Sequence, residues 1–244
     1  MTYCLAIRLD EGIVFLSDTR TSAGVDNISI YRKMHVLAPT PDRTFVIQSA
    51  GNLATTQEVL DRIDRDLRAD DGRDTLATVD HLFEAALYVG RVSRAVVASH
   101  RDALTASGAD GSATFILGGQ ITGETPEIFL VYPEGNYIRA SKTRPFLQIG
   151  ETKFGKFWLE LAVQPGVDLD VATQIALGSM LSTTRANLSV GPPFDLAIYR
   201  NDALAIDEHR IEADSDYLTD IQQRFVQHLF EALGELPPIP WSDD

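Results

Sequence analysis

A threonine at position 2 is the first residue of this sequence whose type and place could do chemistry. A small residue after methionine generally permits removal of the methionine, and loss of Met1 would leave Thr2 with a hydroxyl and a free α-amine. The pKa of an ordinary α-amine is about 7.7–8, close to where a general base works best at neutral pH. Thr2 would then carry both nucleophile and base. Taken alone, Thr2 is more simply the second residue of a chain, so the prediction depends on its neighbours.

Two charged residues could activate the Thr2 hydroxyl. Asp18 ends an apolar run, where a buried carboxylate needs a partner, and Lys33 lies just before the next apolar run. A lysine paired with Asp18 beside Thr2 would lower the pKa of the hydroxyl, because positive charge stabilises the developing alkoxide. The alternatives are a turn or capping role for Asp18 and a solvated surface position for Lys33.

The register of the first hairpin decides whether Thr2 and Asp18 meet. Two apolar runs flank Asp10-Glu11-Gly12, which is typical of a β-hairpin. If these three residues form the loop, Cys4 faces Asp18 and Thr2 faces Arg20, so Thr2 and Asp18 become diagonal neighbours about 7–8 Å apart on one face. A two-residue loop would shift the register by one and send Asp18 to the other face. We therefore predict the three-residue loop.

The remaining elements are predicted from apolar periodicity and turn residues. We expect strands over residues 2–9, 13–17, 35–38, 44–49, 113–119, 128–132, 137–140, 146–150, 194–199 and 204–206. We expect helices from Asn52, from an Asp74 or Thr75 cap to about Val97, and over 153–162, 169–188 and 215–233. Strands and helices thus come in blocks rather than alternating one by one, which predicts an α+β fold with two sheets packed face to face and helix pairs outside.

The end of the chain has a helix and an extended tail. The buried stripe of the last helix is expected to hold Leu218, Ile221, Phe225, Leu229 and Leu233. The proline-rich tail over 237–244 could dock on the body or on a neighbouring molecule. We expect residues 1–236 to form a single domain.

Composition excludes several classes of protein. The chain has 244 residues, 44% of them hydrophobic, so its core needs no disulfide or metal to be stable. A net charge of −14 without a basic cluster argues against a nucleic-acid or anionic-membrane partner. The five histidines lack zinc spacing and the single cysteine cannot form an internal disulfide, so no metal or other cofactor is predicted. The absence of a signal leader and of any long apolar run favours a cytoplasmic protein that begins at Met1.

These motifs in combination resemble those of proteasome β-type subunits, and the resemblance spans nearly the whole chain. The residues that carry it are Thr2, the segment Ser17-Asp18-Thr19-Arg20-Thr21, Lys33 and the segment Gln48-Ser49-Ala50-Gly51-Asn52. A closer similarity, to the bacterial homologues called Anbu, rests on Met1-Thr2-Tyr3-Cys4-Leu5, Tyr31-Arg32-Lys33-Met34-His35 and Gln148-Ile149-Gly150-Glu151.

The resemblance implies an N-terminal-nucleophile hydrolase with a four-layer αββα sandwich of two antiparallel sheets. It implies Thr2 as nucleophile, Asp18 and Lys33 as the activating pair, and the Gly51 backbone N–H as donor to the tetrahedral oxyanion. A glycine at a strand-to-helix junction lets N–H groups approach such an oxyanion closely, although it is equally a turn glycine.

The resemblance also implies a substrate cleft lined by Thr21 and Ser22. The Ser22 backbone would pair with an extended peptide as an added strand. Ser49 and Leu53 would shape the pocket for the residue before the cut.

Two positions depart from the pattern of proteasome β subunits. Glu151, in Gly150-Glu151-Thr152, replaces a serine that helps to hold the amine of the nucleophile. The segment Ala186-Asn187-Leu188-Ser189 keeps the serine of a late Asp-x-x-Ser pattern and loses its aspartate. We expect Glu151 and Ser189 to support the site, and we expect the altered surroundings to hold Thr2 less firmly, giving a slower or narrower activity.

The leading hypothesis is a threonine peptidase that cuts unfolded or short peptide chains inside a self-assembled ring or open helical washer. Whether an ATP-dependent unfoldase assists is left open. A second hypothesis keeps the same chemistry on a small amide substrate. A third is a ring-forming assembly subunit with weak or no catalysis.

Overall fold

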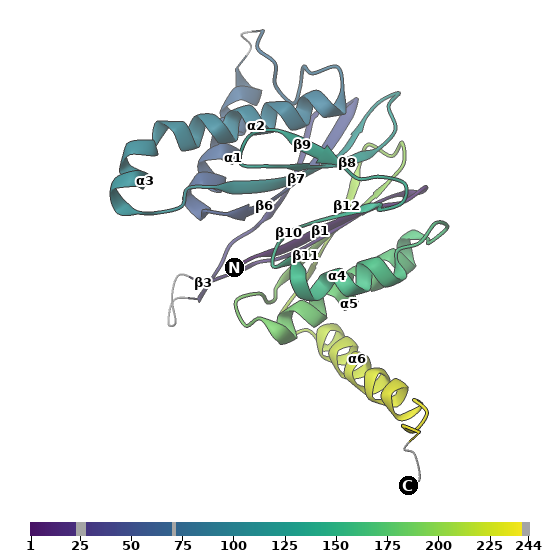
Figure 1. Ribbon diagram of the computed structural model, residues 1–244. Coiled ribbons are helices and arrows are strands. Elements are labelled where there is room, and N and C mark those ends of the chain that lie inside the picture. The colour runs from purple at the N-terminus through teal and green to yellow at the C-terminus, as the bar shows by residue number, and fades with distance from the viewer. Residues whose placement is uncertain (23–27, 70–71, 241–244) are drawn as a thin grey trace.

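The fold is a sandwich of two β-sheets with helices on both outer faces (Figure 1). The computed structural model describes residues 1–22, 28–69 and 72–240. In this part of the chain, the strands form two five-stranded antiparallel sheets, in the orders β10-β1-β2-β11-β12 and β5-β6-β7-β8-β9, and a separate β3-β4 pair. The layer order α, β, β, α confirms the predicted α+β sandwich.

The element bounds are as follows. The strands are β1 (Tyr3–Arg8), β2 (Gly12–Asp18), β3 (Arg20–Ser22), β4 (Ile28–Ile30), β5 (Met34–Thr40), β6 (Arg43–Gly51), β7 (Ala113–Ile121), β8 (Glu127–Val131), β9 (Tyr137–Arg139), β10 (Phe146–Gly150), β11 (Phe194–Arg200) and β12 (Ile206–Ile211). The helices are α1 (Leu53–Arg68), α2 (Leu82–Ser99), α3 (Arg101–Ser107), α4 (Thr152–Ala162), α5 (Leu169–Ala186) and α6 (Asp216–Gly234).

The core lies in three layers, one between the sheets and one under the helices on each side. Strand β1 contributes to two of them. Tyr3, Leu5 and Ile7 pack toward α4 and α5, whereas Cys4 and Ala6 face the other sheet. A strand covered on both faces is apolar at both parities, which explains the unbroken apolar run of β1. By alternation, the side chain of the residue before Tyr3 faces the space between the sheets.

The first hairpin has a two-residue turn, so the predicted three-residue loop was wrong. Cys4 pairs with Ser17, and the Leu9 N–H donates to the Gly12 carbonyl at 2.8 Å. Gly12 belongs to β2 because it pairs with Arg200 of β11, and a Cβ there would lie 1.9 Å from the Tyr199 carbonyl oxygen. The glycine permits close approach of two strands rather than forming the turn, and the sequence of the hairpin alone does not contain β11.

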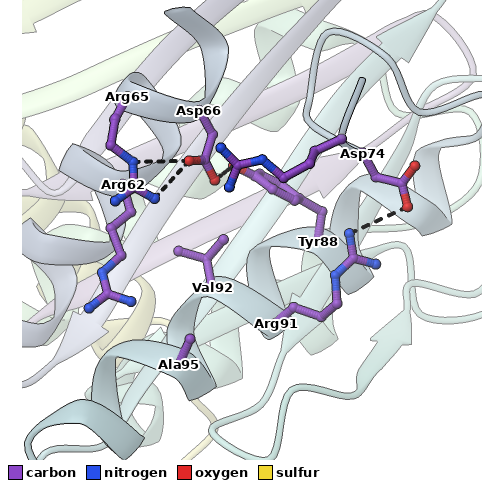
Figure 2. A pocket seen from close by; sticks show the side chains of 9 residues that line it. Arg62, Arg65, Asp66, Asp74, Tyr88, Arg91, Val92 and Ala95 are labelled. Atoms are coloured by element: carbon purple, nitrogen blue, oxygen red, sulfur yellow. Dashed lines mark hydrogen bonds and ion pairs between the residues drawn. The ribbon is translucent and has the colours of Figure 1, made fainter. Parts of the chain in front are cut away.

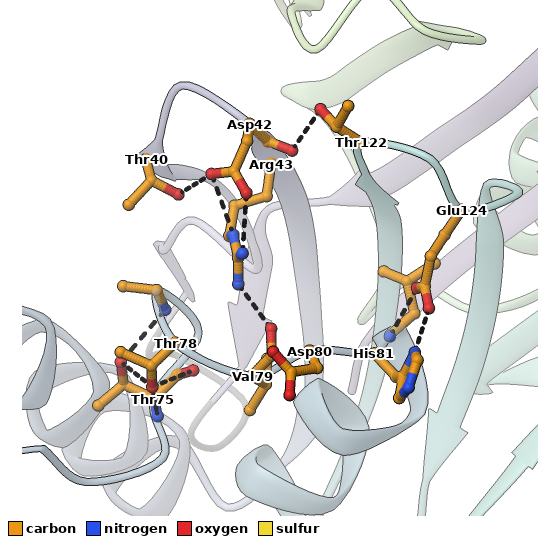
Figure 3. Close-up of polar contacts among 12 residues, drawn as sticks. Thr40, Asp42, Arg43, Thr75, Thr78, Val79, Asp80, His81, Thr122 and Glu124 are labelled. Atoms are coloured by element: carbon orange, nitrogen blue, oxygen red, sulfur yellow. Dashed lines mark hydrogen bonds and ion pairs between the residues drawn. The ribbon is translucent and has the colours of Figure 1, made fainter.

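The second helix starts later than predicted, with its N-cap at His81 instead of Asp74 or Thr75. The Glu84 carboxylate accepts from the His81 N–H at 3.0 Å, and the Glu124 carboxylate accepts from the Leu82 N–H at 3.0 Å. Figure 3 shows Glu124 reaching this helix start from the β7–β8 turn. Its capping role could not be predicted because the two segments are distant in sequence.

The segment before that helix is a hydrogen-bonded turn. The Thr75 N–H donates to the Thr78 hydroxyl at 2.8 Å. The Arg43 guanidinium donates to the Val79 carbonyl at 2.7 Å and to the Asp42 carboxylate at 2.8 Å (Figure 3). These contacts hold the segment against the β5–β6 turn. They also give backbone N–H and carbonyl groups of the segment hydrogen-bond partners that a helix would otherwise supply.

The C-terminal helix departs furthest from expectation. Of its predicted stripe only Leu218 is fully buried, while Leu229 and Leu233 are 49% and 53% exposed. Figure 1 shows α6 leading away from the sandwich, which explains their exposure.

Strand β12 also starts later than predicted, because Asp202 and Leu204 have positive φ angles and extend the turn. None of the described helices is long and apolar enough to cross a membrane.

Candidate active site

Asp18 ends β2 as a fully buried carboxylate with three hydrogen-bond donors. Its Oδ1 accepts from Lys33 Nζ at 2.7 Å and from the Tyr3 N–H at 2.9 Å, and its Oδ2 accepts from the Gly191 N–H at 3.2 Å. Burial raises the pKa of the Asp18 carboxyl above its usual 3.8, and the Lys33 ammonium and the backbone donors oppose that shift. Asp18 is therefore a buried partner for the lysine and not a turn or capping residue.

Lys33 lies directly before β5, and only 4% of it is exposed. Its Nζ donates to Asp18 Oδ1 at 2.7 Å, to the Arg20 carbonyl at 2.5 Å and to the Met1 carbonyl at 3.2 Å. An ammonium has three protons, and each of these has an acceptor. Lys33 is thus a buried cation directed at the start of the chain, and the solvated alternative is excluded.

Thr2 is held at the start of β1 by β10. Tyr3 pairs with Gly150, and the Glu151 N–H donates to the Thr2 carbonyl at 2.7 Å, so Thr2 and Glu151 continue the ladder as opposed residues. Gly150 has φ +83°, and a Cβ there would lie 2.0 Å from the Thr2 carbonyl oxygen. Only glycine permits this approach without strain. The Thr2 side chain faces the space between the sheets by alternation along β1, whereas the Glu151 carboxylate turns toward the loop after α5.

Asp18 reaches the site by a different route from the predicted one. With the observed register, Asp18 has the parity of Leu16, which faces the helices, and not that of Thr2. The carboxylate meets the chain start through the Tyr3 backbone N–H and through Lys33. The structure therefore brings Thr2, Asp18 and Lys33 together, although the face-sharing argument for their meeting was wrong.

Glu151 and Ser189 are linked through the loop after α5. Glu151 accepts a hydrogen bond from Asn187 Nδ2 at 3.0 Å, and Asn187 Oδ1 accepts from the Ser189 N–H at 3.0 Å. The same loop supplies the Gly191 N–H that donates to Asp18. The loop therefore frames the site from the helix side.

The end of β6 frames the site from the other sheet. The Ser49 N–H donates to the Lys33 carbonyl at 2.9 Å, and Cys4 Sγ lies 3.9 Å from the Ser49 carbonyl oxygen. Gly51 is exposed at the end of β6 with φ +114°, and a Cβ there would lie 2.4 Å from the Ser112 carbonyl oxygen. Asn52 follows it as the N-cap of α1, which begins at Leu53. Gly51 therefore sits where the positive end of a helix dipole meets the site.

Thr21 and Ser22 lie on β3, opposite Ser29 and Ile28 of β4. Strand β3 follows Arg20, whose carbonyl accepts from Lys33, so the two residues are adjacent in the chain to the buried pair. The predicted cleft residues thus come from strands and loops that meet at the same end of the sandwich.

Sequence reasoning missed three groups that hold the site. The Tyr3 and Gly191 N–H groups donate to Asp18, and the Arg20 guanidinium donates to the Leu188 carbonyl at 2.9 Å. A Cβ at Gly191 would lie 2.3 Å from the Arg20 guanidinium carbon, so a larger residue there would displace the Arg20 side chain. The only signal was Gly191-Pro192-Pro193, which marks a constrained loop but not its neighbour. Within the described residues, no three His, Cys, Asp or Glu residues form a metal-ligand set.

The search against protein-family models found no match. No curated protein matched either. Solved structures do. "Anbu (ancestral beta-subunit) from Yersinia bercovieri" is 41% identical with a TM-score of 0.91, over 98% of this chain and 100% of that chain. "Helical Assembly of the Anbu Complex from Pseudomonas aeruginosa" is 38% identical with a TM-score of 0.92, over 100% of both chains. An Anbu structure from Hyphomicrobium sp. strain MC1 is 41% identical with a TM-score of 0.88, over 98% of this chain and 100% of that chain.

The αββα layers, with a threonine at the chain start beside a buried Lys–Asp pair, define a protein of the proteasome β-subunit type, with the fold of N-terminal-nucleophile hydrolases. Identities of 38–41% over at least 98% of the chain then give the family. The chain belongs to the Anbu family, as its sequence motifs predicted.

Proposed function

We propose that this protein is a threonine-type hydrolase that cleaves peptide bonds once Met1 has been removed. The observation that carries the proposal is the buried Lys33 ammonium, which donates both to Asp18 and to the Met1 carbonyl. That carbonyl belongs to the bond between Met1 and Thr2, so Lys33 lies beside the nitrogen that becomes the free amine. Removal of Met1 takes away one acceptor of Lys33, and in the proposed enzyme the Thr2 hydroxyl oxygen takes its place.

The free amine of Thr2 would serve as the base. With Met1 present, burial lowers the pKa of the terminal ammonium below 8.0, the Lys33 ammonium lowers it further, and Asp18 raises it. After trimming, the amine lies one residue nearer to Lys33, and the cation acts more strongly. A lowered pKa increases the fraction of amine that is neutral, which is the form that accepts a proton.

In the proposed reaction, the Thr2 hydroxyl is the nucleophile and the Thr2 amine is the base. The Thr2 hydroxyl proton passes to the amine as Oγ bonds to the substrate carbonyl carbon, and the Gly51 N–H stabilises the oxyanion. The ammonium returns the proton to the leaving nitrogen as the peptide bond breaks, which leaves an ester on Thr2. Water then gives a proton to the amine, attacks the ester carbon and releases the acid, and Thr2 Oγ regains the proton.

A peptide is the substrate that suits this surface. Within the described residues β3 has no ladder partner other than β4, so its second edge is open to an added strand beside Thr21 and Ser22. Ser49 and Leu53 would then line the pocket next to the cleaved bond. A panel of peptides and small amides tests this assignment, since turnover of small amides alone would reject the peptide and keep the Thr2 chemistry.

We include self-association in the proposal. The Pseudomonas aeruginosa relative is described as a helical assembly, and it is 38% identical to this chain over its full length. That relative alone would also be compatible with a purely structural subunit, which was the third hypothesis. The buried Lys33–Asp18 pair favours an active subunit, because a wall element has no need for a desolvated ion pair at the chain start.

Intact-mass spectrometry tests the proposal directly. We expect the purified protein to lack Met1 and to gain one inhibitor mass after exposure to a threonine-directed epoxyketone or β-lactone. The epoxyketone reacts with both the free amine and the hydroxyl of a terminal threonine, whereas the β-lactone acylates the hydroxyl. Retention of Met1 would contradict the proposal, because an amide nitrogen is not a base.

Glu151 is proposed as the anionic neighbour of the Thr2 amine. The Glu151 N–H donates to the Thr2 carbonyl at 2.7 Å, which makes the two residues neighbours, and Asn187 anchors the Glu151 carboxylate at 3.0 Å. A carboxylate beside an amine favours the protonated amine. It therefore opposes the effect of Lys33 and sets the pH at which the amine becomes a base.

Replacing Glu151 by glutamine is expected to move the acid limb of the pH profile of kcat/KM to lower pH, by up to about one unit. Glutamine keeps an oxygen for Asn187 but removes the charge, so the amine loses its proton more easily. Glu208→Gln, on the exposed strand β12, is the matched control and should leave the profile unchanged. An unmoved profile in Glu151→Gln would assign Glu151 a purely structural role.

A further inference from the structure

Two adjacent hollows on the outer helix layer are lined by arginines. The first, of about 450 Å³, lies between α1, the 73–74 segment and α2 (Figure 2). The second, of about 510 Å³, lies on the other side of α2 next to Pro133. They share Arg91 and Ala95 and so form one surface, which we call the arginine groove. Its arginines are Arg62, Arg65, Arg73, Arg91, Arg94 and Arg101.

The arginine groove is positively charged on a protein whose net charge is −14. Against its six arginines, the lining contains two carboxylates, Asp66 and Asp74, and Glu58 outside the lining pairs with Arg62 at 2.6 Å. Asp66 accepts from Arg65 at 2.8 Å and from the Tyr88 hydroxyl at 3.0 Å. Asp74 lies 3.7 Å from Arg91, and both side chains are more than half exposed, so this ion pair is weak and does little to occupy Arg91. Figure 2 shows these contacts around the first hollow.

The second hollow contains no carboxylate at all in its lining. Arg91, Arg94 and Arg101 surround it, and the exposed Ala95 and Ala98 lie between them. A residue pair three or four positions apart shares one face of a helix, so Arg91, Arg94, Ala95 and Ala98 form a single strip of α2. Alanine has no side chain beyond Cβ, and the floor between the guanidinium groups is therefore low. A ligand backbone can approach α2 closely at this point.

The length of the arginine groove favours an extended peptide ligand over a single small ion. From Arg91 to Ser99 the helix rises about 12 Å, and Arg101 lies beyond its end. One phosphate group can reach one or two of these guanidinium groups, whereas four extended residues of a peptide span about 13 Å. Carboxylates accept two parallel hydrogen bonds from one guanidinium, which fits arginine in particular.

The surrounding charge limits the length of such a ligand. A nucleic acid would run past the groove onto a surface with a large excess of acidic residues and would be repelled there. A short acidic segment ends before it leaves the basic area. We propose that the arginine groove binds a short peptide segment rich in aspartate or glutamate, carried by a partner protein. This site is separate from Thr2 and does not depend on its chemistry.

Fluorescence anisotropy of a labelled peptide with alternate glutamates tests the proposal on the full chain. The triple substitution Arg91→Ala, Arg94→Ala and Arg101→Ala should weaken binding by at least about tenfold, because three charge-assisted contacts are lost. All three side chains are exposed, and thermal melts should confirm that the fold is unchanged. Raising the ionic strength from about 0.05 to 0.15 M should also weaken binding, since the Debye length shortens.

A charge-matched control separates the groove from net charge. Arg185, Arg200 and Arg224 are exposed arginines elsewhere, and replacing all three by alanine changes the net charge equally. We expect this control to bind the peptide like the wild type, and equal weakening of both variants would overturn the proposal. A lysine triple at Arg91, Arg94 and Arg101 should bind with intermediate affinity. Displacement of the peptide by tripolyphosphate at equal charge concentration would also overturn it, because it would indicate an unselective anion surface.

Discussion

Replacement of Thr2 by alanine is expected to abolish peptide hydrolysis, with a loss of at least about 10³-fold in kcat. The substitution removes the only oxygen proposed to bond to the substrate and leaves the Thr2 backbone in place. Alanine is also small, so Met1 should still be removed and the free amine should still form. The loss would therefore report the hydroxyl alone. Initial rates on a fluorogenic peptide, with the masses of both proteins, measure it.

Two companion variants make the result specific. Thr2→Ser keeps a hydroxyl and should retain part of the activity, since serine and threonine both serve as nucleophiles. The melting temperature of Thr2→Ala should change little, because Thr2 is only partly buried and its backbone carbonyl, which accepts from the Glu151 N–H, is kept. Equal turnover by wild type and Thr2→Ala would support the structural-subunit hypothesis instead.

The sequence was sufficient for the fold class because that inference needs only local pattern. Apolar runs and helical stripes place most strands and helices, and their order in blocks excludes a parallel α/β sheet. Prediction from the sequence failed at element boundaries that are set by residues distant in the chain. Gly12 belongs to β2 because it pairs with β11, and α2 starts at Leu82, where Glu124 caps it from another turn.

The candidate site shows the same division. Thr2, Asp18 and Lys33 could be selected by residue type and motif, and the structure brings them together. The groups that hold Asp18 could not, because the Gly191 N–H comes from a residue 173 positions away. Backbone donors carry no residue-type signal, so a sequence shows which side chains a site has but not what orients them.

The exposure of α6 has a related cause. Leu229 and Leu233 fit a buried stripe by spacing, yet each is about half exposed. Amphipathic periodicity shows that a helix has an apolar face, but it does not identify the surface that covers that face. The periodicity was correct, and the inferred burial within this chain was not.

Replacement of Lys33 by methionine is expected to destabilise the protein by about 3–5 kcal/mol at pH 7 and to stop catalysis. Methionine keeps most of the side-chain length, so the loss comes from leaving the Asp18 carboxylate buried without its cation. Adding Asp18→Asn should recover part of the stability but none of the activity, because the uncompensated charge is then removed. Arg224→Met, which breaks the exposed pair with Asp220, is the matched control and should cost at most about 1 kcal/mol.

The pH dependence of Lys33→Met distinguishes a buried charge from lost packing. Burial already raises the pKa of the folded Asp18 carboxyl, and without Lys33 it rises further. Between the unfolded pKa near 3.8 and the raised folded value, the folded state binds more protons than the unfolded one, so stability falls as pH rises. Acidification from about pH 7 to pH 5 should therefore narrow the gap in unfolding free energy between variant and wild type. A gap that stays constant across this range in denaturant titrations would mean that methionine fails by packing alone, and that Asp18 carries no buried charge for Lys33 to balance.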